Sequence, residues 1–202
     1  LLSQFDAVCL TGGSTYARDL PVPGRELWGI HLAMDYLPQQ NRIQAGESIA
    51  PEQRITAEGK RVVILGGGDT GADCLGTAHR QGAEVVHQWE LLPEPPQKRA
   101  STNPWPQWPL TLKGSPAHEE GGVRDYSILT KGFSGTDGRV QKLHAVRIEW
   151  GPPDSSGRPA MIEVPGSEFE IDTGLVLLAL GFLHPQPEGL LAELGVELDP
   201  RG

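Results

Sequence analysis

Cysteine is nearly absent from this chain: among 202 residues there are two, Cys9 and Cys74. Neither belongs to a Cys-x-x-Cys pair, which argues against a disulfide framework and against a zinc or iron–sulfur site held by the chain. We therefore expect no metal site and expect both cysteines to be small, buried side chains. Sparse, unpaired cysteine is typical of the reducing cytoplasm, which is the expected location.

Basic residues and long apolar runs are also lacking. The chain has 17 Lys and Arg against 26 Asp and Glu, a net charge of −9, and no cluster of basic residues. Nucleic acid is therefore not an expected partner, because neutralising phosphates requires clustered cations. No apolar run approaches the roughly 20 residues that cross a bilayer, so a membrane partner is not expected either. The chain begins without a signal segment, and we expect it to be a piece of a longer polypeptide.

The pattern that is present between residues 61 and 91 predicts a βαβ unit. Residues 61–65 form a continuous β-branched run of the kind found in buried parallel strands. A glycine turn and a helical stretch to Gln81 follow, with Gly82 placed to end the helix, and residues 85–91 read as the second strand. The expected fold class is therefore α/β, with a Rossmann-like dinucleotide-binding domain.

The rest of the chain reads as further strands, two helices and one long loop. Residues 93–122 include seven prolines together with Trp105 and Trp108, and show no helical or strand period. Strands are expected at residues 7–10, 126–133, 140–150, 161–171 and 175–180, and helices at residues 30–37, ended by Pro38, and 188–194.

The glycine turn between the first strand and helix of the βαβ unit carries the functional signal. Residues 66–71, Gly-Gly-Gly-Asp-Thr-Gly, match the pattern Gly-x-Gly-x-x-Gly. Gly66 permits the tight turn, Gly68 leaves room for a pyrophosphate, and Gly71 lets helix and strand pack closely. The phosphates would lie on the N–H groups at the helix start, which the spacing of Thr70 and Asp73 places near Thr70.

Glu90 is the second part of this signal. It stands 19 residues after Gly71, at the end of the second strand, where a carboxylate can accept hydrogen bonds from an adenosine ribose. The alternative is a solvent-facing charge at a strand end. With strand, turn, helix and carboxylate in order, the sequence predicts dinucleotide binding.

Other functions are excluded or stay open. No P-loop and no Gly-x-Ser-x-Gly elbow is present. A methyltransferase, which uses a similar turn and an acidic residue, stays open, as does a non-catalytic interaction module built on the loop with Trp105 and Trp108. The run His118-Glu119-Glu120 invites a metal interpretation but has no second ligand cluster at helical spacing, so a polar loop segment is favoured.

Longer segments resemble one family, the small (beta) subunit of glutamate synthase. They are Val-Val-Ile-Leu-Gly-Gly-Gly-Asp-Thr-Gly-Ala-Asp-Cys at residues 62–74, Leu-Leu-Pro-Glu-Pro-Pro at 91–96, Asn-Pro-Trp-Pro at 103–106, His-Glu-Glu-Gly-Gly at 118–122 and Leu-Gly-Phe at 180–182. The run Arg-Asp-Leu-Pro-Val-Pro-Gly at residues 18–24 is similar to the family's crossing from the flavin domain.

The resemblance implies a glutathione-reductase-like architecture with two interleaved dinucleotide domains. Residues 1–23 would be a remnant of the FAD domain with the crossover. Residues 24–171 would be the NAD(P)H-binding domain, and residues 172–202 the return to the FAD domain. The family's first flavin glycine motif, its late Gly-Asp motif and its cysteine-rich, cluster-binding domain are missing from the sequence. We therefore expect FAD in the full-length parent but not in this chain, and we expect the isolated chain to be inactive.

The resemblance also implies a function and its partners. The parent would be an oxidoreductase that passes electrons from NAD(P)H through FAD and iron–sulfur clusters to a glutamate synthase large subunit, for glutamate synthesis from glutamine and 2-oxoglutarate. An NAD(P)H module of another FAD-dependent reductase, linked to pyrimidines or to ferredoxin, is the alternative. No side chain of this chain need act as an acid or base.

The expected cofactor-binding residues are those of the turn, the strand end and two outlying positions. Gly66, Gly67, Gly68 and Gly71 would hold the pyrophosphate, Asp69 and Thr70 would orient it, Glu90 would hold the ribose, and Gly181 would lie near the nicotinamide by family analogy. Glu90 favours NADH over NADPH, because it repels a 2′-phosphate and its neighbours Trp89 and Leu91 cannot bind one. Against this, Lys98 and Arg99 follow closely, and the loop would bring Arg99 onto a phosphate if it folded back.

Overall fold

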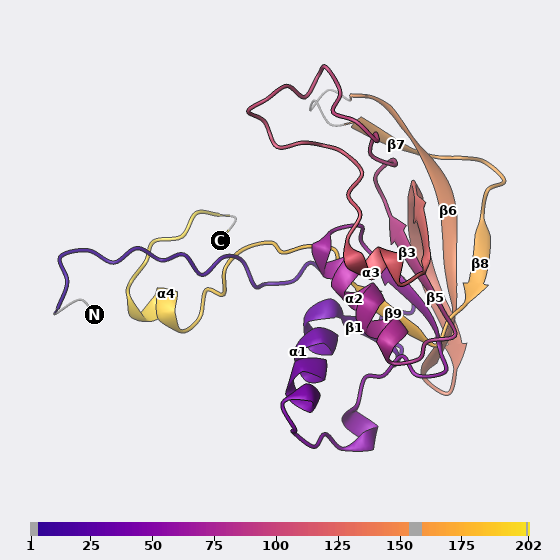
Figure 1. Ribbon diagram of the computed structural model, residues 1–202, viewed down its shortest axis with the longest axis horizontal. Helices are drawn as coiled ribbons and strands as arrows, with labels where there is room; N and C mark the ends of the chain where they lie inside the picture. The colour runs from indigo at the N-terminus through magenta and orange to yellow at the C-terminus, as the bar shows by residue number, and fades with distance from the viewer. Residues whose placement is uncertain (1–3, 154–158, 201) are drawn as a thin grey trace. The chain divides into compact units, whose positions relative to one another are not determined.

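A computed structural model describes residues 4–153, 159–200 and 202, and it divides into two compact units (Figure 1). The larger unit is Asp19–Ala179, and the smaller one combines Leu1–Arg18 with Leu180–Gly202. This division follows contacts within the chain. The domain boundaries expected from the resemblance, after residues 23 and 171, stay a prediction.

A five-stranded parallel sheet lies at the centre of the larger unit. Its order is β1 (Ile30–Leu32), β9 (Leu175–Leu178), β2 (Arg61–Leu65), β3 (Val85–Glu90) and β4 (Val123–Tyr126), and every neighbouring pair is parallel. Residues 62–64 of β2 are fully buried, as expected for a strand covered on both faces. The strand order reverses beside β2, so the predicted Rossmann-like fold is confirmed.

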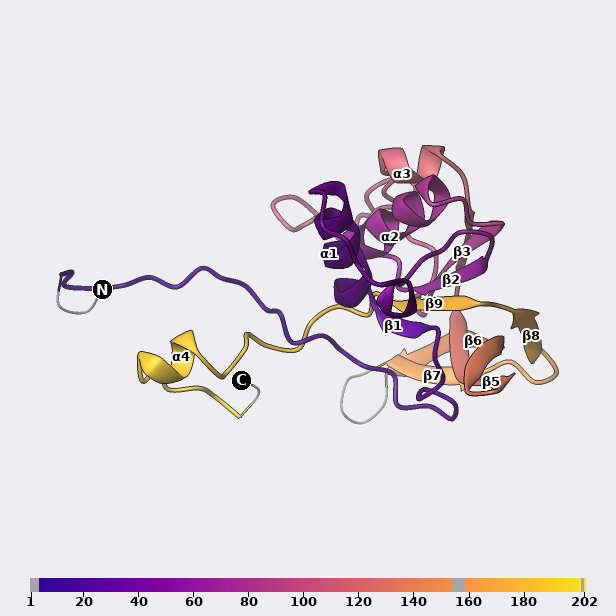
Figure 2. The ribbon, with the colours of Figure 1, turned by 90° about the horizontal axis from the view of Figure 1, so that it is seen from below.

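Helices cover one face of this sheet (Figure 2). They are α1 (Ala33–Gln44), α2 (Asp69–Arg80) and the single turn α3 (Pro116–Glu119), with a short 3-10 turn at Pro51–Gln53. Alternate residues of β2, Val62 and Ile64, pack against Leu75 and Ala78 of α2 in one apolar core. The helix α2 ends as predicted: Gly82 has φ +83°, and the N–H of Ala83 donates to the carbonyl of Ala78.

An antiparallel sheet covers the other face (Figure 2). It consists of β5 (Ile128–Thr136), β6 (Arg139–Pro153), β7 (Pro159–Glu163) and β8 (Phe169–Asp172), and β6 pairs with the other three. Trp89 of β3 packs edge-on against Phe169, with ring centroids 5.5 Å apart. Arg147 of β6 forms a two-pronged ion pair with Asp125 of β4, at 2.7 and 2.6 Å. These contacts join the two sheets.

Two predicted strands each prove to be a pair of strands. Predicted residues 126–133 divide at Ser127, whose φ of +55° turns the chain from β4 of the parallel sheet into β5 of the antiparallel one. Predicted residues 161–171 divide into β7 and β8 around Pro165 and Gly166, where φ is +74°. In both places a turn falls within a run that is apolar enough to read as one strand.

The predicted helix at residues 30–37 was wrong at both ends. Its first residues form β1, and α1 runs on through Pro38 to Gln44. An internal proline costs a helix about 3 kcal/mol, so contacts of the residues on either side of Pro38 must offset that cost. Gln39 bonds Gln53 and Ile55, and the fully buried Tyr36 donates to Gln81 at 2.9 Å.

The smaller unit holds two extended segments side by side. Ala17 and Phe182 form an antiparallel bridge, and Tyr16 exchanges backbone hydrogen bonds with Leu183 and His184 at 2.8 and 3.0 Å. The predicted strand at residues 7–10 is not formed, because it pairs with no other strand among the described residues. Cys9 there is exposed, contrary to prediction.

The remaining helix and cysteine follow the predictions more closely. The C-terminal helix α4 (Leu190–Glu193) is shorter than the predicted 188–194. Cys74 is buried as predicted, which raises the pKa of its thiol to about 12. No helix in the described part of the chain is both long and apolar enough to cross a membrane.

Candidate functional site

The glycine turn joins β2 to α2, and two of its glycines are required by backbone packing. Gly66 has φ +124°, and a β-carbon there would lie 2.1 Å from the carbonyl oxygen of Ala179, at the end of β9. A β-carbon on Gly71 would lie 2.3 Å from the carbonyl oxygen of Gly66. Any side chain at either position would push the turn away from the sheet.

Gly68 differs from these two glycines. Its φ of −82° is open to every residue, and a β-carbon there would meet no atom within 4 Å. Gly68 is the N-cap of α2, and no side chain bonds the helix start as a cap. The helix therefore begins at Asp69, one residue before the predicted Thr70. Open space beside the first N–H groups of a 12-residue helix is the arrangement that binds anions.

Glu90 closes the other side of the turn. One carboxylate oxygen accepts from the N–H of Gly67 at 2.7 Å, and the other accepts from the N–H of Leu92 at 3.0 Å. A β-carbon on Gly67 would lie 2.8 Å from Glu90 Oε2, so a side chain at position 67 would displace the carboxylate. Glu90 is thus fixed against the turn and is not a solvent-facing charge.

A cavity of about 590 Å³ opens beside Gly68 at the carboxyl ends of β2, β3 and β4. The residues that line it come from the glycine turn, the ends of β3 and β4, the long loop and α3. The lining residues are Gly67, Gly68, Asp69, Ala72, Glu90, Leu92, Pro93, Glu94, Pro95, Pro96, Leu110, Thr111, Leu112, Lys113, Gly114, Ser115, His118, Arg124 and Tyr126.

The predicted site residues fall into groups. Gly67, Gly68, Asp69 and Glu90 line this cavity, whereas the buried Gly66 and Gly71 and the partly buried Thr70 do not. Gly181 belongs to the smaller unit and has φ +82°.

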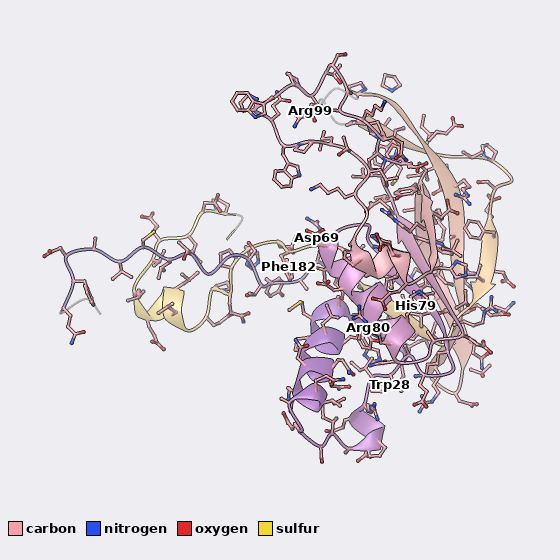
Figure 3. All side chains as sticks on the ribbon, in the orientation of Figure 1. Trp28, Asp69, His79, Arg80, Arg99 and Phe182 are labelled. Carbon is pink, nitrogen blue, oxygen red and sulfur yellow. The ribbon has the colours of Figure 1, made fainter. Side chains whose placement is uncertain are left out.

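Arg99 lies on the outer part of the loop and does not line the cavity (Figure 3). Its guanidinium donates to the carbonyl oxygens of Asn103 and Gln107 at 3.0 and 2.9 Å. Asn103, which is 8% exposed, in turn accepts from the N–H of Leu110 and donates to the Gln107 side chain. Arg99 therefore holds the loop in shape.

The sequence did not reveal four polar residues of the site. Lys113 and Arg124 bring positive charge to the cavity, and Gln88 and His118 lie beneath and beside the turn. The polar Gln88 inside an apolar strand was the one available signal. His118 lies in the short helix α3 and not in a polar loop, and its pKa is lowered by burial and, second, by the charge of Arg124.

Comparison with known sequences finds close relatives over the whole chain, although no family model matches it. The chain is 53% identical over its full length to the glutamate synthase [NADPH] small chain of Mycobacterium tuberculosis and spans 41% of that protein. It is 45% identical to glutamate synthase [NADH] of Schizosaccharomyces pombe, covering 98% of this chain and 10% of that one. The small chain of Bacillus subtilis is 38% identical, with 97% of this chain and 41% of that one covered.

Solved structures share the fold at low sequence identity. FprA, an oxidoreductase of Mycobacterium tuberculosis solved in complex with NADPH, matches with a TM-score of 0.64 and 18% identity, over 94% of this chain and 53% of that one. Thioredoxin reductase of T. acidophilum matches with a TM-score of 0.56 and 19% identity, over 94% of this chain and 48% of that one. Both likenesses concern the fold.

Proposed function

The chain belongs over its whole length to the glutamate synthase small-chain family, and we propose that it is the nicotinamide-dinucleotide-binding part of that flavoprotein reductase. It spans about two fifths of the small chains it matches. The activity of the whole protein, NAD(P)H oxidation through FAD and iron–sulfur clusters for glutamate synthesis, is part of the proposal. So is its partner, a glutamate synthase large subunit.

The open space at Gly68 carries the proposal. Gly66 and Gly71 are explained by contacts within the chain, but a β-carbon at Gly68 meets nothing. A dinucleotide pyrophosphate fits this space, because the uncapped start of α2 supplies N–H donors and a favourable dipole there. The cavity of about 590 Å³ lies within the usual range of cofactor pockets.

The chain's own residues bind and orient the cofactor and need not transfer protons. The N–H groups at the start of α2 hold the pyrophosphate, and Glu90 accepts hydrogen bonds from the adenosine ribose. Leu92, Pro93, Pro95 and Pro96 line the cavity beside Glu90, and these apolar side chains would exclude water from the adenosine end. The nicotinamide cofactor supplies the hydride when bound.

Three other functions stay open, and one titration tests two of them. An NAD(P)H module of a pyrimidine- or ferredoxin-linked reductase would bind the same cofactor and differ in its electron acceptor. A methyltransferase would bind S-adenosylmethionine, and a non-catalytic interaction module would bind neither. We expect the purified chain to bind NADH or NADPH and not S-adenosylmethionine in a calorimetric titration. Binding of S-adenosylmethionine alone would contradict the proposal.

We further propose that FAD is held mainly by the remainder of the parent protein. The described glycine turn with a cavity beside it serves one dinucleotide, and the sequence lacks the family's two flavin motifs. The isolated chain should therefore purify colourless, without the visible absorbance of a flavin. A yellow preparation with one FAD per chain would contradict this expectation.

The choice between NADH and NADPH depends on the charges around the cavity. Glu90 is tied to the turn through both carboxylate oxygens and would repel a 2′-phosphate at about 4 Å by around a few kcal/mol, at an effective dielectric near 20. Lys113 and Arg124 oppose this repulsion, whereas Asp69 and Glu94 add to it, since all four line the same cavity. The relatives' names include both cofactors. We propose that Glu90 prevails and that NADH is preferred.

Replacing Glu90 with alanine tests this choice. Loss of the carboxylate removes the repulsion of the 2′-phosphate. Glu90→Ala should therefore lower the ratio of the NADPH to the NADH dissociation constant by about tenfold, or about 1.4 kcal/mol. Calorimetric titration with each cofactor gives the ratio. Arg99→Ala is the matched control and should leave it unchanged. A wild-type preference for NADPH that Arg124→Ala abolished would assign the choice to β4 instead.

We propose that the outer part of the long loop, which carries Trp105 and Trp108, is the surface that contacts the large subunit. Trp105 and Trp108 are 83% and 72% exposed, so they do not cover this domain's own core. The loop extends beyond the sheets (Figure 1), and its shape is fixed by Arg99 and Asn103. Exposed tryptophans on an ordered loop lose little entropy on binding and are frequent at interface hot spots.

Replacing both tryptophans with alanine in the full subunit should weaken association with the large subunit. We expect a loss of about 2 kcal/mol or more, roughly thirtyfold, because tryptophan is a common hot-spot residue. NADH affinity should stay unchanged, because neither residue lines the cavity. Leu110 does line it, so Leu110→Ala serves as the contrasting variant. Unchanged subunit assembly, measured by analytical ultracentrifugation, would contradict the proposal.

A further inference from the structure

Gln88 is a polar side chain inside the apolar strand β3, and it is 2% exposed. Burying an unpaired amide is costly, so both ends of such a side chain need partners. Its Nε2 donates to the carbonyl oxygen of Gly66 at 2.9 Å, and its Oε1 lies 2.9 Å from Nε2 of His118. One side chain thus connects the glycine turn to α3.

These bonds fix the protonation of His118. The carbonyl of Gly66 can only accept, so the amide nitrogen of Gln88 faces it and the amide oxygen faces His118. The imidazole must therefore carry its proton on Nε2 and donate it. Its Nδ1 accepts from the N–H of Ser115 at 3.0 Å. The Ser115 hydroxyl oxygen also lies 3.2 Å from Nδ1 and can donate to it. The neutral ring with this tautomer accepts from Ser115 and donates to Gln88, whereas a charged ring would set a second N–H against that of the Ser115 backbone.

Gln88 also sets the shape of the turn from within. A β-carbon on Gly71 would lie 2.6 Å from Gln88 Nε2, so the amide fills the space between strand and helix. His118 and Ser115 both line the cavity, and Ser115 lies where the long loop ends and α3 begins. The turn, the loop end and α3 are held as one unit by this path of hydrogen bonds.

We propose that Gln88 and His118 are positioning residues of the dinucleotide site, which act through the glycine turn and hold it preformed while His118 is neutral. The inference rests on the proposed function. Neither residue need touch the pyrophosphate. Protonation of His118 would break the hydrogen bond from Ser115 and loosen both the glycine turn and the end of the long loop. Cofactor affinity would therefore fall in acid.

The charges around His118 come from every element packed near it. They are Asp69, His79 and Arg80 on α2, Glu90 on β3, Arg124 on β4, Glu94 and Lys113 on the loop, and Glu119 and Glu120 on α3 itself, with Glu120 paired to Arg80. Burial and, second, the charge of Arg124 lower the pKa of His118 below its ordinary value, so the neutral ring is favoured and the charge is gained only in acid. Carboxyl, lysine and arginine side chains as classes titrate outside the window from pH 5.5 to 8. His79 is present in every variant, so its contribution cancels in their comparison.

Three variants distinguish a role in positioning the dinucleotide site from a role in folding alone. His118→Gln places an amide N–H near the position of Nε2 and cannot titrate, and His118→Leu removes the donor. His87→Gln, on the same strand as Gln88 but outside the cavity, is the matched control. NADH and NADPH are each titrated calorimetrically into every variant between pH 5.5 and 8, and urea unfolding at pH 8 checks that each is folded. Titration of the 2′-phosphate of NADPH is common to all variants and cancels in their comparison.

Wild-type protein and His87→Gln should lose affinity between pH 8 and 5.5 by less than about tenfold, because the lowered pKa of His118 leaves the ring only partly protonated at pH 5.5. His118→Gln should bind within about threefold of wild type at pH 8 and lose that dependence, and His118→Leu should bind about tenfold more weakly at pH 8. A His118→Gln variant that kept the wild-type pH profile would overturn the inference and leave the proposed function intact. So would a folded His118→Leu variant that bound like wild type at pH 8. Wild-type protein that bound neither cofactor at pH 8 would overturn the proposed function, and the inference with it.

Discussion

Gly66→Ala should destabilise the chain by about 3 kcal/mol or more, which is a large part of the 5–15 kcal/mol that stabilises a typical domain. The residue has φ +124°, and its β-carbon would lie 2.1 Å from the backbone oxygen of Ala179. Strained backbone alone costs about 1–3 kcal/mol, and here a rigid strand end cannot move aside. For a domain of this size we expect the melting temperature to fall by about 6–12 °C.

Gly82→Ala is the matched control for this prediction. Gly82 also has a positive φ, +83°, but a β-carbon there would meet no atom within 4 Å. Its replacement should cost about 1 kcal/mol, the usual penalty for losing a glycine after a helix. Equal losses from the two substitutions in urea unfolding would show that the contact between the turn and β9 does not determine the stability of the turn.

Gly68→Val should leave the fold intact and weaken dinucleotide binding by about 3 kcal/mol, roughly a hundredfold. Position 68 has ordinary backbone angles and open space beside it, so the side chain meets a bound pyrophosphate and not the protein. The melting temperature should fall by no more than about 4 °C, since replacing an N-cap glycine with an apolar residue costs about 1 kcal/mol or less. Fluorescence titration with NADH measures the affinity, and undiminished binding would contradict the prediction.

The sequence predicted the βαβ unit well because its determinants are local. The buried run of β2, the turn and the glycine after α2 follow one another within residues 61–82, and each acts on its neighbours. The elements that were wrong depend on distant contacts. Pro38 lies within α1 because Tyr36 and Gln39 are held by residues far along the chain. Ser127 separates two strands because they join different sheets.

The residues of the candidate site divide in the same way, into those placed by local sequence and those placed by distant contacts. The glycines and Glu90 follow directly from spacing, because the turn and the end of the next parallel strand must meet. Arg124, Lys113 and His118 reach the cavity only through the pairing of β3 with β4 and the folding of the loop. Arg99 was expected to reach a phosphate, but backbone carbonyls of its own loop hold it away from the cavity.

An amide NMR titration of the isotope-labelled chain with NADH and NADPH shows whether the dinucleotide binds at the glycine turn. We expect the largest shifts at Gly67, Gly68 and Asp69, with further shifts at Leu92 beside Glu90, and we expect Gly68→Val to abolish them. Shifts concentrated around Trp105 and Trp108, or no shift with either cofactor, would contradict it.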